Sequence, residues 1–483
     1  MKTLSLSKAF VFMALITCLG VMLSGCPKNI KLSNPNESII PHTDSLPYKP
    51  DELVVWKKPS YSQVDFKNWL DTFASHYGTV DVHYYCASCD STLVLLKGNG
   101  IKLLLEGVPP GGTGKSLPPK VAGGDGPAYI SVNFNFRIPE QDSNNYGVES
   151  NPNVVADIPK FIKRVNYKHK DEVVVAVFDS GIDTLKLDDF AYQSTSSACL
   201  ITSTGTGNAN KGWNFADKNA DLTDHDQMHH GSVVTKFIID QAENYHNNPV
   251  RILPVKLFGM HTTATLFDVL CAFAYAKERG AKIINASFGF YTLNDQIAQR
   301  TNVKDEGLLL FKTFLKKNLD SANILLIAAA GNTNRNALND FSDYYSTTNG
   351  YNNLDSIGFY PASLSGFASN IIAVTTIGKQ DLKVSPNQNH SDSLVGIGVI
   401  ADRGTVFLNP LNAQGKTVEG TSFATPIVAG KIAANYYQVK GFIRTQPTRD
   451  QLLQYLKGIG LISTSAGNTR LTTEIIDGNY TRK

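Results

Sequence analysis

Near its C-terminal end the chain carries the stretch Gly420-Thr421-Ser422-Phe423-Ala424-Thr425-Pro426-Ile427-Val428-Ala429-Gly430. Its small and apolar residues predict a buried helix with Ser422 in the first turn. Backbone N–H groups in the first turn of a helix have no intrahelical partner, so they can bind a developing negative charge. Ser422 is therefore either a nucleophile or only a polar residue that caps the helix. Partners elsewhere in the chain must decide between these alternatives.

Apolar strands and helices alternate in the long segment that precedes this stretch. We expect strands at residues 173–178, 251–257, 281–286, 324–329 and 371–376. We expect helices at residues 230–242, 266–279, 308–318 and 421–437. Uninterrupted apolar strands are typical of a mostly parallel sheet that helices cover on both faces. Ligand sites in such sheets form at the carboxyl ends of the strands.

Three further polar groups stand at the ends of these elements. Asp179 follows the strand 173–178, where a buried carboxylate needs a partner, although it could also cap a turn. His230 opens the helix 230–242 and is followed by Gly231, which permits close packing around the ring. Taken alone, a histidine in this place is more often structural than catalytic. Asn332 follows the strand 324–329 and brings a side-chain amide donor to the same edge of the sheet.

The motifs Asp-Ser-Gly, His-Gly-Ser-x-Val and Gly-Thr-Ser-x-Ala-x-Pro around these residues resemble the subtilisin-like serine proteases, the subtilases of peptidase family S8. They occur in that family's order of acid, histidine and serine. An esterase of the α/β-hydrolase type would place its serine first. The resemblance covers about residue 153 to the C-terminus. It implies an α/β class and a subtilisin-like three-layer fold with a mostly parallel sheet.

The resemblance implies a serine endopeptidase that acts on proteins or peptides through an acyl-enzyme intermediate. Ser422 would attack, His230 would accept its proton, and Asp179 would orient the imidazole. The oxyanion would be held by the Ser422 backbone N–H and the Asn332 side chain. The chemistry requires no cofactor. The alternative is a catalytically silent peptide-binding or scaffold protein on the same fold, against which the presence of all four residues argues.

The resemblance also implies how a substrate would bind. The segment expected to pair its backbone with an extended substrate is Ser287, Phe288 and Gly289. The residues expected to wall the pocket for the residue before the scissile bond are Ala330 and Gly331.

Several positions depart from the pattern of the family. His229 stands where the family usually has glycine, which brings the orientation of the catalytic ring into question. The segment 396–401 lacks the Ala-Pro-Gly commonly found before the serine region. Asp188 and Asp189 stand where many relatives place a calcium-binding aspartate, although two surface acids are the simpler interpretation.

The N-terminus has the pattern of an export signal at residues 1–25. Lys2 and Lys8 precede an apolar core that is too short for a permanent membrane helix. The core runs into Leu23-Ser24-Gly25-Cys26, which resembles a bacterial lipobox. That resemblance implies acylation of Cys26 and a lipoprotein anchored to a membrane of the cell envelope, on its periplasmic or surface side. An ordinary secretory signal with a chance cysteine is the alternative.

Two units are expected after the signal. Residues 26–50 are polar and predict a tether. Residues 51–139 predict a small α+β unit, with strands at 53–56, 80–85, 91–97 and 129–136 and a helix at 62–76. This unit resembles the propeptide or inhibitor-like domain that often precedes subtilases, and cleavage would fall between residues 139 and 160. A permanent accessory domain is the alternative. Residues 153–483 form the expected peptidase domain.

Composition excludes several other classes. The 483 residues are 42% hydrophobic and 18% charged, which indicates a globular protein, and the formal charge of +3 gives no reason to expect nucleic-acid binding. The pair Cys86 and Cys89 predicts a local disulfide, with a free pair or half of a metal site as alternatives. Cys199 and Cys271 are expected to be structural.

Overall fold

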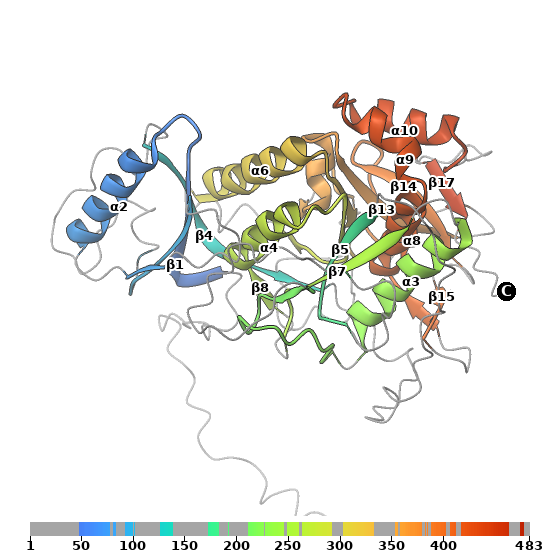
Figure 1. Cartoon of the computed structure of the whole chain (residues 1–483), viewed down its shortest axis with the longest axis horizontal. Coiled ribbons are helices and arrows are strands. Elements are labelled where there is room, and N and C mark those ends of the chain that lie inside the picture. The colour runs from blue at the N-terminus through green and yellow to red at the C-terminus, as the bar shows by residue number, and fades with distance from the viewer. Residues whose placement is uncertain are drawn as a thin grey trace, which may run out of the picture. The chain divides into compact units, whose positions relative to one another are not determined.

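The apolar segments predicted as strands form a parallel sheet (Figure 1). In the computed structural model, strands lie side by side in the order β17-β14-β13-β11-β9-β5-β7-β6, and neighbouring strands are parallel. Along the chain they are β5 (Val173–Asp179), β6 (Trp213–Asn214), β7 (Val250–Lys256), β9 (Ile283–Ala286), β11 (Leu325–Ala329), β13 (Ile371–Gly378), β14 (Val395–Ala401) and β17 (Glu474–Asp477). Every residue of β5, β9 and β11 is buried, which explains why their sequences are mostly apolar. The predicted mostly parallel sheet is confirmed.

The structure describes residues 48–77, 81–83, 92–99, 101, 126–138, 172–182, 192, 211–226, 228–245, 249–259, 263–291, 303–332, 353–355, 358–378, 382, 384, 388–401, 406–411, 417–462 and 474–477. Several predictions lie outside these residues: the signal, most of the tether, the segment expected to be cleaved, and the residues Cys26, Cys86, Cys89, Asp188, Asp189 and Cys199.

Helices cover both faces of the sheet. The described helices of this part are α3 (His230–Tyr245), α4 (Leu266–Glu278), α6 (Val303–Ala322), α8 (Thr421–Ala434), α9 (Tyr436–Ile443) and α10 (Arg449–Gly458). Val175 of β5 packs in one apolar cluster with α3, α8, α9 and α10, whereas its neighbour Ala176 packs in another with α4 and α6. Successive side chains of a strand face opposite sides of its sheet, so the helices form two layers. The three-layer α/β fold is confirmed.

The carboxyl ends of three central strands lie next to one another. Phe178 of β5 pairs with Ala286 of β9, and Ala286 pairs in turn with β11. Asp179 at the end of β5, Ser287 after β9 and Asn332 shortly after β11 therefore reach the same edge of the sheet. This is the edge where parallel sheets form their binding sites.

The predicted helix 421–437 is two helices. Asn435, with φ of −112° and ψ of 17°, lies outside helical geometry and separates α8 from α9. Its backbone N–H donates to the Ile432 carbonyl at 3.1 Å, which closes the last turn of α8. The prediction was therefore wrong in its C-terminal bound, although the start at Thr421 was right.

The N-terminal unit is a second, antiparallel sheet with one helix. Its elements are β1 (Tyr48–Lys57), α2 (Gln63–Tyr77), β2 (Asp81–His83), β3 (Leu93–Lys97) and β4 (Ala128–Arg137). The strand order is β2-β3-β1-β4-β8, in which β8 (Thr263–Thr265) comes from the segment before α4. Phe66, Leu70 and Phe73 of α2 pack on one face of this sheet.

The opposite face of the N-terminal sheet contacts α4 and α6. Trp56 and Phe136 belong to the same apolar cluster as the residues of these two helices. The ring of Trp56 lies 5.1 Å from that of Phe314 in an edge-on arrangement. Asn133 is buried, and its Oδ1 accepts a hydrogen bond of 2.9 Å from the Phe267 backbone N–H in the first turn of α4.

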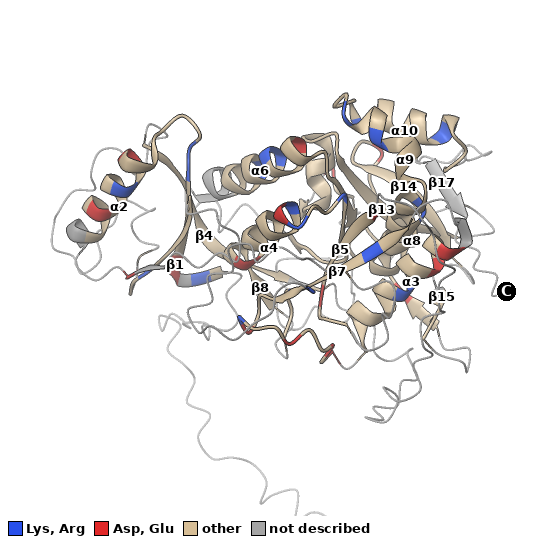
Figure 2. Cartoon of the chain, in the orientation of Figure 1, with Lys and Arg blue, Asp and Glu red and all other residues tan. Residues whose placement is uncertain are grey.

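The helices carry charged residues of both signs, and α4 carries a cysteine. Figure 2 shows acidic and basic residues together on α2 and on α6. Cys271 of α4 is buried and disulfide-bonded, which confirms its predicted structural role. Among the helices that the structure describes, none combines the length and the apolar character that a bilayer crossing requires.

Candidate active site

Asp179 lies at the end of β5 with 2% of its surface exposed. A carboxylate in such a place needs partners, because little water can reach its charge. Its Oδ1 accepts hydrogen bonds from the Ser180 backbone N–H at 2.8 Å and from the Ser180 hydroxyl at 3.2 Å. The same oxygen lies 2.7 Å from Nδ1 of His230. Asp179 thus stabilises its own turn and also holds the histidine.

His230 is the first residue of α3, and a glycine brings it close to β5. A Cβ built on Gly231 would lie 2.1 Å from the carbonyl oxygen of Gly181 and 3.1 Å from Cβ of Asp179. Only a residue without a side chain allows this approach. Asp226 stabilises the start of α3, since its Oδ2 accepts the His230 backbone N–H at 3.2 Å.

His229 has a left-handed backbone conformation, with φ of 51°. Glycine adopts this conformation freely, and histidine is among the residues that tolerate it best after glycine. The geometry explains why a glycine is common at this position and how a histidine can replace it. Because His230 still reaches Asp179, the departure at His229 does not misplace the catalytic candidate.

The surroundings of His230 raise its pKa. Burial alone would lower the pKa of the imidazole, but the charge and hydrogen bond of Asp179, with the charges of Asp226 and Asp224, outweigh that effect. Because Nδ1 donates to Asp179, the lone pair of the neutral ring is on Nε2. Nε2 is buried and has no hydrogen-bond partner among the described residues. This is the arrangement that a general base requires.

Asp224 connects Ser180, the residue after Asp179, to the first turn of α3. Its Oδ1 accepts a hydrogen bond of 2.8 Å from the Ser180 hydroxyl, and its Oδ2 accepts the Ser232 backbone N–H at 2.9 Å and hydroxyl at 2.8 Å. The Ser180 hydroxyl in turn accepts the Gly231 backbone N–H at 3.0 Å. Burial raises the pKa of Asp224, although the hydrogen bonds from Ser232 act against the shift.

Ser422 is fully buried in the first turn of α8, and Gly420 is the N-cap residue of this helix. Gly420 has φ of 126°, which only glycine adopts without strain. Pro426 lies four residues after Ser422 and lacks the N–H that would pair with the Ser422 carbonyl. The hydroxyl of Ser287 donates to that carbonyl at 2.8 Å instead. The proline of the motif thus leaves an acceptor that connects α8 to the end of β9.

The hydroxyl of Ser422 donates to the carbonyl oxygen of Ser287 at 3.2 Å. It is close to the histidine, since the ring of the next residue, Phe423, lies 5.3 Å from the ring of His230. Hydrogen bonds between catalytic groups are often poorly aligned before substrate binds.

Asn332 is oriented by the residue that precedes the serine. Its Oδ1 accepts the Thr421 backbone N–H at 2.9 Å and the Thr421 hydroxyl at 3.1 Å. A Cβ built on Gly420 would lie 2.7 Å from Nδ2 of Asn332. The amide nitrogen of Asn332 therefore lies against Gly420, two residues before Ser422.

The residues expected to bind substrate surround this position. Phe288 is fully buried, with its ring 5.8 Å from that of Phe136 in an edge-on arrangement. Its side chain therefore anchors the segment Ser287–Gly289. Ala330 is buried, and Gly331 has φ of 97°.

Sequence reasoning missed four residues that hold the site: Ser180, Asp224, Thr421 and Asn389. Nδ2 of Asn389 donates to the Ala330 carbonyl at 2.8 Å, and its backbone N–H donates to the Gly331 carbonyl at 2.9 Å. Ser180 and Thr421 could have been found from their places beside Asp179 and Ser422. Asp224 and Asn389 carry no comparable signal, because their contacts join segments that are distant in the sequence.

A buried acid, histidine and serine near one another at the edge of a three-layer α/β sheet fit the arrangement of a Ser-His-Asp triad. The family model described as the subtilase family, Peptidase S8, matches residues 170–455. This match covers more than half of the 483 residues, and the chain belongs to the subtilase family.

Individual relatives are distant. The cell wall-associated protease of Bacillus subtilis (strain 168) is 22% identical over 306 residues, which is 62% of this chain and 27% of that protein. The chain thus spans about a quarter of the length of that relative. The structure of a mutant of the epidermin leader peptide processing serine protease from Staphylococcus aureus has a TM-score of 0.50 at 16% identity. The structural match covers 87% of this chain and 95% of that protease chain.

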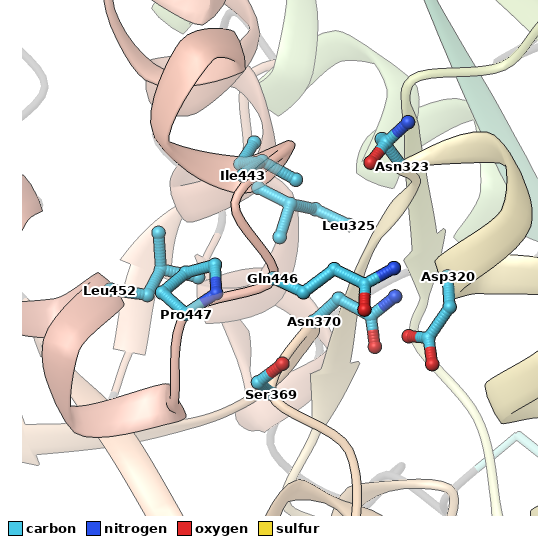
Figure 3. A pocket seen from close by; sticks show the side chains of 9 residues that line it. All are labelled: Asp320, Asn323, Leu325, Ser369, Asn370, Ile443, Gln446, Pro447 and Leu452. Carbon is cyan, nitrogen blue, oxygen red and sulfur yellow. The ribbon is translucent and has the colours of Figure 1, made fainter.

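No cluster of three or more His, Cys, Asp or Glu side chains that could hold a metal ion occurs within the described ranges. A small hollow lies at the opposite edge of the sheet, beside Asn323 and Leu325 at the start of β11 (Figure 3). Its volume of about 10 Å³ suits about one water molecule. This hollow is too small and too far along the strands to take part in the site.

Proposed function

We propose that the protein is a serine endopeptidase that uses Ser422, His230 and Asp179. The observation that carries the proposal is the buried 2.7 Å contact between Asp179 and His230 beside a serine at a helix start. The raised pKa of His230 supports it, because the cationic ring that forms during catalysis is stabilised by the same carboxylate.

The reaction begins when the Ser422 hydroxyl turns from the Ser287 carbonyl to Nε2 of His230. The serine oxygen attacks the peptide carbonyl carbon while Nε2 takes its proton. The Asn332 amide and the Ser422 backbone N–H donate to the oxygen that becomes negative. His230 then gives the proton to the leaving amine, and a water molecule hydrolyses the acyl-enzyme by the same steps in reverse order. No step requires a cofactor. A structural calcium at Asp188 would leave these steps unchanged.

Hydrolysis of an internally quenched protein substrate tests the proposal. We expect Ser422→Ala to reduce kcat by about 10⁶-fold, the magnitude known for subtilisin itself. Ser321 in α6, whose hydroxyl donates to the Asn318 carbonyl at 3.3 Å, offers a helical serine as the control, and Ser321→Ala should leave the rate unchanged. Equal hydrolysis by the wild type and Ser422→Ala would contradict the proposal.

The second candidate is a catalytically silent peptide-binding or scaffold protein. One observation favours it: the hydroxyl of Ser422 is hydrogen-bonded to Ser287 and not to His230. On this account, peptides would bind at the strand ends and remain intact. Binding of a peptide substrate by the wild type without any cleavage would support this candidate.

We propose further that the N-terminal unit is a propeptide-like domain that folds against α4 and α6. The apolar contact through Trp56 and Phe136 and the pairing of β4 with β8 support this assignment. If Ser422 cleaves the connection between residues 139 and 160, the wild type will give two bands on a denaturing gel and Ser422→Ala one. Identical full-length bands would instead favour a permanent accessory domain.

We also propose that the protein is exported and anchored by lipid on Cys26. The lipobox-like sequence before Cys26 supports it, and so does the disulfide at Cys271, because disulfides persist mainly in oxidising compartments. Mass spectrometry of the mature N-terminus provides the test. We expect a peptide that begins at an acylated Cys26, and an unmodified chain that begins elsewhere would contradict lipid anchoring.

A further inference from the structure

The ring of Phe359 fills the space between Gly289 and Gly331. A Cβ built on Gly289 would lie 2.4 Å from Cζ and 2.5 Å from Cε1 of this ring. A Cβ built on Gly331 would lie 2.9 Å from Cε1 and 3.0 Å from Cδ1 of the same ring. These distances leave no room for even a methyl group between the ring and either backbone.

Other residues hold the ring in this position. Phe359 belongs to β12 (Phe359–Tyr360), which pairs antiparallel with β10 (Phe290–Tyr291). The Phe359 backbone N–H donates to the Ser363 hydroxyl at 3.0 Å. The side chain shares an apolar cluster with Leu354 and Ala330, and only 2% of the residue is exposed. Moving the ring would break these contacts and leave a cavity, so it is a fixed part of the wall.

The two glycines flank the reacting atoms. Gly289 comes two residues after Ser287, whose carbonyl oxygen accepts the hydrogen bond from the Ser422 hydroxyl. Gly331 directly precedes Asn332, which is oriented by the residue before Ser422. In the proposed reaction, Ser422 attacks the carbonyl carbon of the residue before the scissile bond, and the oxygen of that carbonyl faces Asn332. The side chain of this residue then lies beside Gly289 and Gly331.

We infer that Phe359 closes the subsite for the residue before the scissile bond, so that the enzyme cleaves after glycine, alanine or serine. This inference rests on the proposed function and specifies its substrate class. A larger side chain would have to occupy the volume of the Phe359 ring. Apolar pockets discriminate by about 10–200-fold for a single methylene, and a phenylalanine exceeds an alanine by a whole ring.

Peptide amides that differ only in the residue before the scissile bond test the inference. For the wild type we expect kcat/KM for the alanine peptide to exceed that for the phenylalanine peptide by at least about 100-fold. Phe359→Ala should reduce this ratio by at least about 100-fold, because it empties the subsite. Phe359→Leu should give an intermediate ratio. This variant replaces Phe359→Ala in the test if Phe359→Ala does not fold.

Leu354→Ala is the matched control. It truncates a buried apolar side chain of the same cluster, which is not among the nearest atoms to a Cβ at either glycine. It should lower stability while it leaves the ratio unchanged. A wild type that cleaves both peptides equally, or a ratio that is the same in folded Phe359 variants, would overturn the inference. If the subsite inference fails but a small fluorophosphonate still labels Ser422, the proposed function stands. A wild type that is not labelled would overturn both the proposed function and the subsite inference.

Discussion

Gly430 lies where α8 packs against α3, the helices that carry Ser422 and His230. A Cβ built on Gly430 would lie 2.5 Å from the carbonyl oxygen of Ile238 and 2.8 Å from Cβ of Gln241. An ordinary contact begins at 3.4 Å, so Gly430→Ala must separate the two helices by about 1 Å. We expect overpacking to lower the free energy of unfolding by about 1–3 kcal/mol, partly offset by the helix preference of alanine, about 1 kcal/mol.

The same displacement should reduce catalysis, because a misplacement of 1 Å between reacting groups can lower a rate by about 10²-fold. Denaturant unfolding measures the stability, and kcat/KM on a peptide substrate measures the catalytic effect. Gly441→Ala in α9 is the matched control, since a Cβ there would meet nothing within 4 Å. That variant should gain about 0.5–1 kcal/mol and keep its activity. A Gly430→Ala protein as stable and as active as Gly441→Ala would refute the proposed contact between the helices.

Four further predictions follow from the site. The acid limb of the kcat/KM profile should lie above the ordinary imidazole pKa of about 6.5, since His230 acts in its neutral form and the Asp179 charge raises its pKa; a limb below that value would contradict the pairing. Asp179→Asn should lower kcat by about 10⁴-fold, the loss known for such a change in another triad protease. Asn332→Ala should lower kcat by about 10²–10³-fold, the loss known for subtilisin, with little change in KM; an unchanged kcat would remove Asn332 from the oxyanion site. His229→Val should lower the free energy of unfolding by about 1–2 kcal/mol relative to His229→Gly, because a branched side chain tolerates φ of 51° poorly; equal stability in denaturant would contradict the left-handed backbone.

The central strands and the triad candidates could be predicted from local sequence. Mostly apolar runs marked β5, β7, β9, β11 and β13, because strands buried on both faces need mainly apolar residues. Asp179, His230, Ser422 and Asn332 stood at the ends of elements, where a parallel sheet brings polar groups together. The structure places Asp179 and His230 in contact and Asn332 against Thr421.

Other features could not be predicted, because they depend on contacts between distant segments. β8 joins the sheet of the N-terminal unit through β4, more than 120 residues earlier in the chain. Asp224 acts through Ser180 and Ser232, which nothing in the local sequence connects to it. Nothing in the local sequence marks Phe359, and only the structure places its ring between two glycines.

Labelling by a fluorophosphonate tests the central claim most directly, because the reagent reacts only with a serine that a neighbouring base activates. The folded wild type should bind one equivalent of the reagent, and mass spectrometry should locate it on the peptide that contains Ser422. Ser422→Ala should bind none, and His230→Ala should react far more slowly while it unfolds at a similar denaturant concentration. A folded wild type that remains unlabelled, or that is labelled equally after Ser422→Ala, would contradict the assignment of Ser422 as the nucleophile.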